Sequence, residues 1–135
     1  MMRLVVDTNI MLASVGTAAP YRWLFDALLQ EKCHLLVTTE ILLEYSEVIS
    51  SRTKSAVAQN VLETLVNLSS CERITAHFHW NIIFTDPDDN KFVDCAIAGN
   101  ADYIITNDRH FQILSEIDFP RVKAISPEEL WQLFA

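Results

Sequence analysis

Short apolar runs rich in β-branched residues alternate along this chain with segments whose apolar residues recur at helical spacing. Because a period-3.6 pattern marks a helix and a short apolar run marks a buried strand, the two signals can be separated by length. Strands are expected within residues 3–7, 34–39, 72–76, 102–106 and 121–126. Helices are expected over residues 9–15, 21–30, 40–50, 55–69, around 92–97, around 111–114 and over 127–134. The alternation predicts a three-layer α/β/α domain with a mainly parallel sheet of about five strands.

The size and composition of the chain agree with one domain spanning residues 1–135. Half of the residues are hydrophobic, which excludes a disordered chain. No apolar stretch approaches the roughly 20 residues needed to cross a bilayer, so no membrane association is expected. Three cysteines, Cys33, Cys71 and Cys95, show no CxxC spacing and read as buried thiols in a reducing compartment. A cytoplasmic protein is the expectation.

The charge of the chain argues against a static nucleic-acid-binding module. The formal net charge is −8, with 10 Lys and Arg against 18 Asp and Glu. Modules that hold nucleic acid by their phosphates carry a basic surface, and the densest basic cluster here is only Arg52 and Lys54. Any enzyme of this composition that acts on nucleic acid needs metal ions, a partner or a second subunit to offset its acidity.

Four acids stand at positions where packing alone rarely places a carboxylate. Asp7 and Asp108 each follow a predicted strand, Glu44 lies in the second turn of the helix after the second strand, and Asp94 lies among apolar residues of the helix before the fourth. The carboxyl ends of parallel strands meet at one edge of a sheet, so these acids are expected in one cleft. Carboxylates gathered there repel one another unless they bind a hard cation. The pattern predicts a site for one or two Mg²⁺ or Mn²⁺ ions.

Each of these acids also has an ordinary structural explanation. Asp7 and Asp108 can cap the helices that follow them, and a capping carboxylate can still offer an oxygen to a metal. Glu44 can belong to a solvated helix face, while Glu40 is explained by the helix dipole alone. Asp86, Asp88 and Asp89 are explained as turn residues, and Asp88 or Asp89 can cap the next helix. Two interpretations remain open for Arg109 and His110: they lie near a substrate phosphate, or they are ordinary helix residues.

Four segments of the sequence belong together: DTN at 7–9, ILLEYSEVI at 41–49, DPDDNKFVDCAIAGNADYIIT at 86–106 and TND at 106–108. In this order they resemble the PIN-domain family, and more narrowly the VapC-type ribonucleases that act as toxins of toxin–antitoxin systems. The resemblance implies a divalent-metal-dependent endoribonuclease that hydrolyses RNA phosphodiester bonds. It carries the catalytic and metal-binding roles over to Asp7, Glu44, Asp94 and Asp108. Asn9, Thr106 and Asn107 then fall beside the site as small polar residues.

The resemblance also implies partners. An antitoxin protein is one, and a homodimer or higher homo-oligomer is another expectation, since the apolar segment 78–84 is a surface that a partner can cover. Two alternative functions stay open at this stage. One is a catalytically degenerate PIN domain that serves as a protein- or RNA-binding module. The other is a receiver-like or haloacid-dehalogenase-like phosphoryl-transfer domain, although VVDTN lacks the DxDxT nucleophile pattern of the latter.

Overall fold

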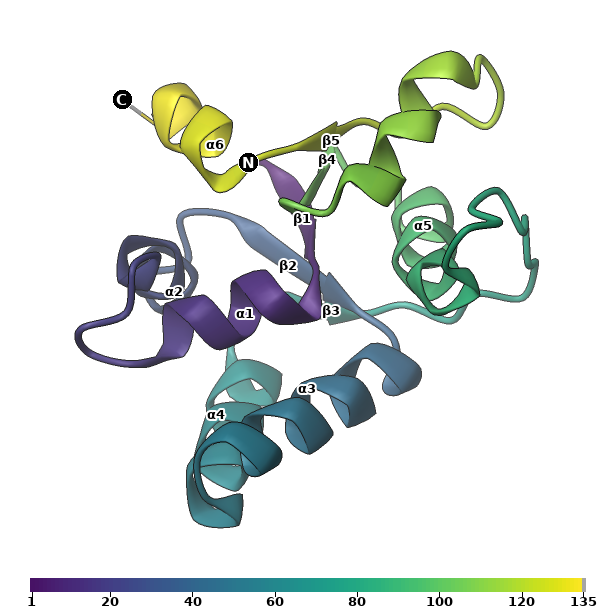
Figure 1. Ribbon diagram of the computed structural model, residues 1–135. Coiled ribbons are helices and arrows are strands. Elements are labelled where there is room, and N and C mark those ends of the chain that lie inside the picture. The colour runs from purple at the N-terminus through teal and green to yellow at the C-terminus, as the bar shows by residue number, and fades with distance from the viewer. Residues whose placement is uncertain (135) are drawn as a thin grey trace.

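The computed structural model describes residues 1–134 and contains five strands and eight helical segments (Figure 1). The strands are β1 (Arg3–Val6), β2 (His34–Val37), β3 (Cys71–Arg73), β4 (Tyr103–Ile105) and β5 (Ala124–Ile125). The α-helices are α1 (Thr8–Val15), α2 (Arg22–Leu29), α3 (Thr39–Arg52), α4 (Ser55–Asn67), α5 (Asn90–Ala98) and α6 (Pro127–Phe134). Two 3₁₀ helices complete the fold, η1 (Pro87–Asp89) and η2 (Arg109–Glu116).

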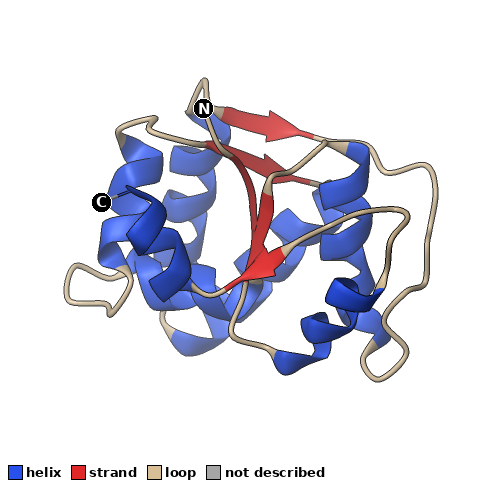
Figure 2. Ribbon diagram, turned by 90° about the horizontal axis from the view of Figure 1, so that it is seen from above, coloured by secondary structure: helices blue, strands red, loops and turns tan. Residues whose placement is uncertain are grey.

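All five strands are parallel and lie in the order β3-β2-β1-β4-β5. Helices cover both faces of the sheet (Figure 2), so the predicted α/β/α architecture is confirmed. From β1 the chain winds outward to β2 and β3, and it then returns through α5 to β4 on the other side of β1. The winding direction therefore reverses between β1 and β4. In open α/β sheets this switch point is where ligand sites form.

The pairing of β1 with β4 fixes the geometry of that switch point. Leu4, Val5 and Val6 are fully buried, as expected for a central parallel strand with helices on both sides. Val6 pairs with Ile105, and the N–H of Asp7 still donates to the carbonyl of Ile105 at 3.1 Å. The residues that leave the two strands, Asp7 and Thr106, are consequently neighbours at the edge of the sheet.

Helix α5 lies close against the sheet and carries the residues that surround the switch point. A Cβ atom on Gly99, at the C-terminus of this helix, would come within 2.8 Å of the Leu36 side chain on β2. Glycine at this position lets α5 approach β2 without displacing the Leu36 side chain. Phe92, Val93 and Cys95 are buried along the same helix. The packing holds α5 in a fixed position beside β1, β2 and β4.

The region before α5 differs from the sequence expectation in one detail. Asp88 or Asp89 was expected to cap the helix, but the Asp86 side chain provides the cap and accepts from the Asp88 N–H at 3.3 Å. The reason is that η1 runs directly into α5, so the first orphan N–H groups belong to η1. Asp89 stands at the N-cap position of α5 without a side-chain capping bond. Its carboxylate is therefore free of a capping role.

Two further segments could not be assigned fully from periodicity. The helix around 111–114 exists, but it is the 3₁₀ helix η2. Residues 76–85 form neither helix nor strand and run along the outside of α5 (Figure 1).

None of the helices within residues 1–134 combines the length and apolar character needed to span a membrane.

Candidate metal centre

Asp7 is held at the carboxyl end of β1 by contacts to both of its oxygens. Its Oδ1 accepts from the Ile10 N–H at 2.9 Å and caps α1. Its Oδ2 accepts from the hydroxyl of Thr106, and the same hydroxyl oxygen accepts from the Asp108 N–H at 2.9 Å. Thr106 thus ties the two acids at the ends of β1 and β4 to each other. The predicted proximity of Asp7 and Asp108 is present in the fold.

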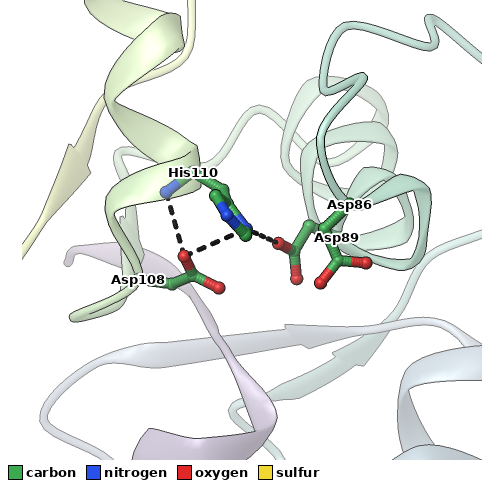
Figure 3. Close-up of side chains that lie close together, drawn as sticks. All are labelled: Asp86, Asp89, Asp108 and His110. Atoms are coloured by element: carbon green, nitrogen blue, oxygen red, sulfur yellow. Dashed lines mark hydrogen bonds and ion pairs between the residues drawn. The ribbon is translucent and has the colours of Figure 1, made fainter.

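Four side chains at this edge bring one ligand atom each to within 4.8 Å of the others. We refer to them as the acid–histidine cluster: Asp86, Asp89, Asp108 and His110. Figure 3 shows Asp108 and His110 at the start of η2, facing Asp86 and Asp89 across from them. Asp108 Oδ1 caps η2 by accepting from the His110 N–H at 2.9 Å. Two turns that are distant in sequence therefore meet at one point.

Two atoms of this cluster are buried without a hydrogen-bond partner, Asp89 Oδ2 and His110 Nδ1. They lie 3.6 Å from each other, and His110 Nδ1 lies 3.3 Å from Asp108 Oδ1. Charge attraction can act over these distances when the imidazole is protonated, but neither contact has hydrogen-bond geometry. Buried polar atoms are nearly always satisfied in folded proteins. An unsatisfied carboxylate oxygen facing an unsatisfied imidazole nitrogen is the arrangement that a cation fits.

The electrostatics of the cluster agree with that interpretation. The pKa of Asp89 is raised to about 6, mainly by burial and then by the nearby carboxylates of Asp86 and Asp108, against the smaller lowering effect of His110. Burial also raises the pKa of Asp7, against the lowering effect of the Thr106 hydrogen bond, and the charge of Asp108 adds to the rise. Carboxylates that resist ionisation because they repel one another are stabilised when a cation binds between them.

Glu44 reaches the same edge from α3, beside the acids rather than among the four cluster residues. Its Oε2 accepts from the hydroxyl of Thr8, the residue after Asp7. Its Oε1 pairs with Lys91 Nζ at 2.6 Å, and the Lys91 side chain is only 14% exposed. Lys91 also donates to the carbonyl of Asp88 at 2.7 Å. Glu44 is therefore positioned between α1 and α5, with its charge balanced by a half-buried lysine.

Asp94 makes different contacts from the other three predicted acids. Its Oδ1 accepts from the Trp80 N–H at 3.0 Å, and its Oδ2 lies 3.2 Å from His79 Nδ1. One helical turn earlier, Asn90 exchanges two 2.9 Å hydrogen bonds with the backbone of Ile83. Both residues fasten the irregular segment 76–85 to α5. The structure does not bring Asp94 into the acid–histidine cluster, and its assignment as a metal ligand stays a prediction.

Of the smaller polar residues expected beside the site, Thr106 contacts the acids and Asn107 does not. Thr106 contacts both Asp7 and Asp108, as described above. Asn107 instead donates to the Tyr21 hydroxyl at 3.1 Å, away from the acids. The backbone N–H of Asn9 helps to lower the pKa of Asp7.

A model of the PIN domain matches residues 3–110 of the sequence. The chain belongs to the PIN-domain family. Its members are typically nucleases, and the resemblance found in the sequence is therefore confirmed at family level. No curated protein matches the sequence significantly.

Two solved structures share the fold of this PIN domain. One is a chain in the crystal structure of VapBC2 from Rickettsia felis bound to a DNA fragment from their promoter, with a TM-score of 0.64 and 18% identity over 93% of this chain and 98% of that chain. The other is the T. brucei RRP44 PIN domain, with a TM-score of 0.54 and 10% identity over 98% of this chain and 81% of that chain. At these identities the likeness concerns the fold.

The donor set of this PIN domain suits a hard divalent ion. The cluster offers carboxylate oxygens from three aspartates and one imidazole nitrogen, and Asp7 lies close enough to Asp89 to raise its pKa. Oxygen donors suit Mg²⁺ and Mn²⁺, and an imidazole is better tolerated by Mn²⁺. Two sequence signals point to the cluster residues that were assigned only to turns or helix starts: the three-residue spacing of Asp86 and Asp89, and a histidine two residues after Asp108. Neither is specific without the fold.

Proposed function

We propose that this PIN domain is a divalent-metal-dependent endoribonuclease that hydrolyses RNA phosphodiester bonds. The observation that carries the proposal is the buried pair of unsatisfied atoms, Asp89 Oδ2 and His110 Nδ1, within a cluster of acids at the topological switch point. In the proposed site, Asp7, Asp89 and Asp108 hold Mg²⁺ or Mn²⁺, with Asp86 and His110 beside them. Such an ion polarises a phosphoryl oxygen and lowers the pKa of a bound water.

The remaining polar residues have positioning roles in this proposal. Thr106 fixes the orientation of Asp7 and Asp108 relative to each other. Glu44 holds Lys91 beside the acids and brings a further carboxylate to the edge of the site. Asp94 keeps the segment before Asp86 in place through the Trp80 N–H. Loss of any of these contacts changes the geometry of the acids without removing a carboxylate from the cluster.

We also propose that the protein acts as the toxin of a toxin–antitoxin pair, with an antitoxin protein as partner, and that it forms a homodimer or higher homo-oligomer. The support for this is the fold it shares with a chain of the VapBC2 complex, together with the exposed aromatic side chain of Phe78. A cytoplasmic location is consistent with three unpaired cysteines.

The test is cleavage of a mixed RNA pool by the full chain with Mn²⁺, with Mg²⁺ and with EDTA. Cleavage is expected only with a divalent ion. The Asp89→Asn variant is expected to cut at least about 100-fold more slowly, because one ligand charge is lost. Asp89 makes no capping bond, so this variant keeps the fold, which circular dichroism checks. Undiminished cleavage in EDTA, or by folded Asp89→Asn, contradicts the proposal.

A further inference from the structure

An acidic PIN domain needs a way to hold RNA that does not depend mainly on phosphate contacts. With 18 acidic and 10 basic residues, the chain has few cations to offer to a polyanion. Proteins that bind single strands also gain affinity from aromatic side chains on which bases stack, and this contribution does not need a basic surface. An exposed aromatic side chain in a groove beside the acids provides a surface on which a base can stack.

Such a groove runs between the segment before α5 and the 3₁₀ helix η2. Its volume is about 470 Å³, within the range of about 300–1,000 Å³ of small-ligand sites. Ile82, Ile83 and Phe84 line it from one side, and Arg109, His110 and Ile113 line it from the other. We call it the Phe84 groove. His110 belongs both to this groove and to the acid–histidine cluster, so the groove opens directly onto the proposed metal site.

Two side chains of the groove suit a nucleotide. Phe84 is 83% exposed, whereas its neighbour Ile83 is buried. Arg109 is exposed and, among residues 1–134, has no carboxylate within ion-pair distance. A free guanidinium beside an exposed aromatic ring offers one partner for a phosphate and one for a base.

We propose that the Phe84 groove binds an unpaired nucleobase of the RNA substrate, next to the phosphate that lies at the acid–histidine cluster. Phe84 stacks on the base and Arg109 contacts the adjoining phosphate. The inference rests on the proposed ribonuclease function and adds to it which residues hold the base beside the cleaved phosphate. A base that is paired is already stacked within a duplex and is not free to enter the groove.

The experiment measures equilibrium binding of a single-stranded oligoribonucleotide that contains 2-aminopurine, whose fluorescence reports stacking, in Ca²⁺ to suppress cleavage. Phe84→Ala is expected to weaken binding about 10-fold or more, and Phe84→Trp to retain it. The matched control is Phe119→Ala, since Phe119 is 81% exposed but does not line the groove. It is expected to bind like the wild type. Arg109→Gln is expected to reduce the slope of log K against log salt by about 0.7.

Several outcomes overturn the inference. Unchanged binding by Phe84→Ala does so, as does an equal loss in Phe84→Ala and Phe119→Ala. If sedimentation shows that Phe84→Ala dissociates a dimer while RNA affinity stays constant, the groove is a protein interface instead. A failure of the proposed nuclease function gives a different result. If RNA binding depends on Phe84 but the protein never cuts RNA, the groove proposal stands and the nuclease proposal is wrong.

Discussion

Acids lie at two places along helix α5. The acid–histidine cluster lies at its N-terminus, and Asp94 lies in its middle. The two places differ in whether the polar atoms have hydrogen-bond partners. In the acid–histidine cluster, Asp89 Oδ2 and His110 Nδ1 are buried without a hydrogen bond. Asp94 is 5% exposed, yet both of its oxygens have partners, the Trp80 N–H and His79. The contacts of Asp94 hold the segment 76–85 in place, whereas the unsatisfied atoms of the acid–histidine cluster face each other and leave a place for a ligand.

The difference follows from helix geometry. Asp89 is the last residue of η1 and precedes α5, whereas Asp94 lies in the second turn of α5, so the two side chains leave different elements. Asn90 and Asp94 are four residues apart and share a face, and both hold the segment 76–85. One face of α5 therefore secures a loop while the start of the helix contributes to the cluster. Asp89 and Asp94 lie in the same short segment of the sequence, yet only Asp89 belongs to the acid–histidine cluster.

The largest expected effect is on metal affinity, measured by calorimetry with Mn²⁺. Asp108→Asn is expected to weaken Mn²⁺ binding at least about 100-fold, beyond what loss of an outer-shell partner costs. Asparagine is also a good N-cap, so η2 is retained. Asp94→Asn is the matched variant and is expected to bind Mn²⁺ nearly as the wild type does. An equal loss in both variants would break the comparison and support the sequence-based prediction of Asp94 as a ligand.

The second effect is on stability, measured by urea unfolding in EDTA. Asp94→Ala leaves the part-buried Trp80 N–H without its acceptor, and we expect it to lower the free energy of unfolding by about 1–3 kcal/mol. Asp94→Asn keeps an acceptor oxygen and is expected to lose less. The His79 contact adds little, because that side chain is 66% exposed. If Asp94→Ala unfolds at the same urea concentration as the wild type, the structural role is wrong.

The smallest effect is on the pH dependence of stability in the metal-free protein. The pKa of Asp89 is raised to about 6 from its ordinary value of 3.8, so its favourable contribution is present below about pH 4 and is lost as the pH rises through 6. Asp89→Asn removes this dependence, and its stability relative to the wild type is expected to increase between pH 4 and pH 7. Thermal melts in EDTA across this range check it. Parallel curves for the two proteins would contradict the raised pKa.

Much of the fold was predictable because its signals are local. The apolar runs became β1 to β5 and the periodic segments became helices, since burial on a central sheet requires those patterns. Ser126 and Glu129, which have the three-residue spacing of a capping box, form a reciprocal cap of α6 with bonds of 3.1 and 3.2 Å. The 3₁₀ form of η2 and the path of residues 76–85 were not predictable, because neither has a periodic pattern.

The sequence by itself determined that Asp7 and Asp108 lie together, because each follows a central strand and parallel strands end at one edge. Only the tertiary structure decided which other side chains join them. Asp86, Asp89 and His110 enter the cluster because η1 and η2 meet across the switch point, and Asp94 turns to Trp80 because its helical face meets segment 76–85. The directions of these side chains depend on how separate elements pack together, and no local pattern carries that information.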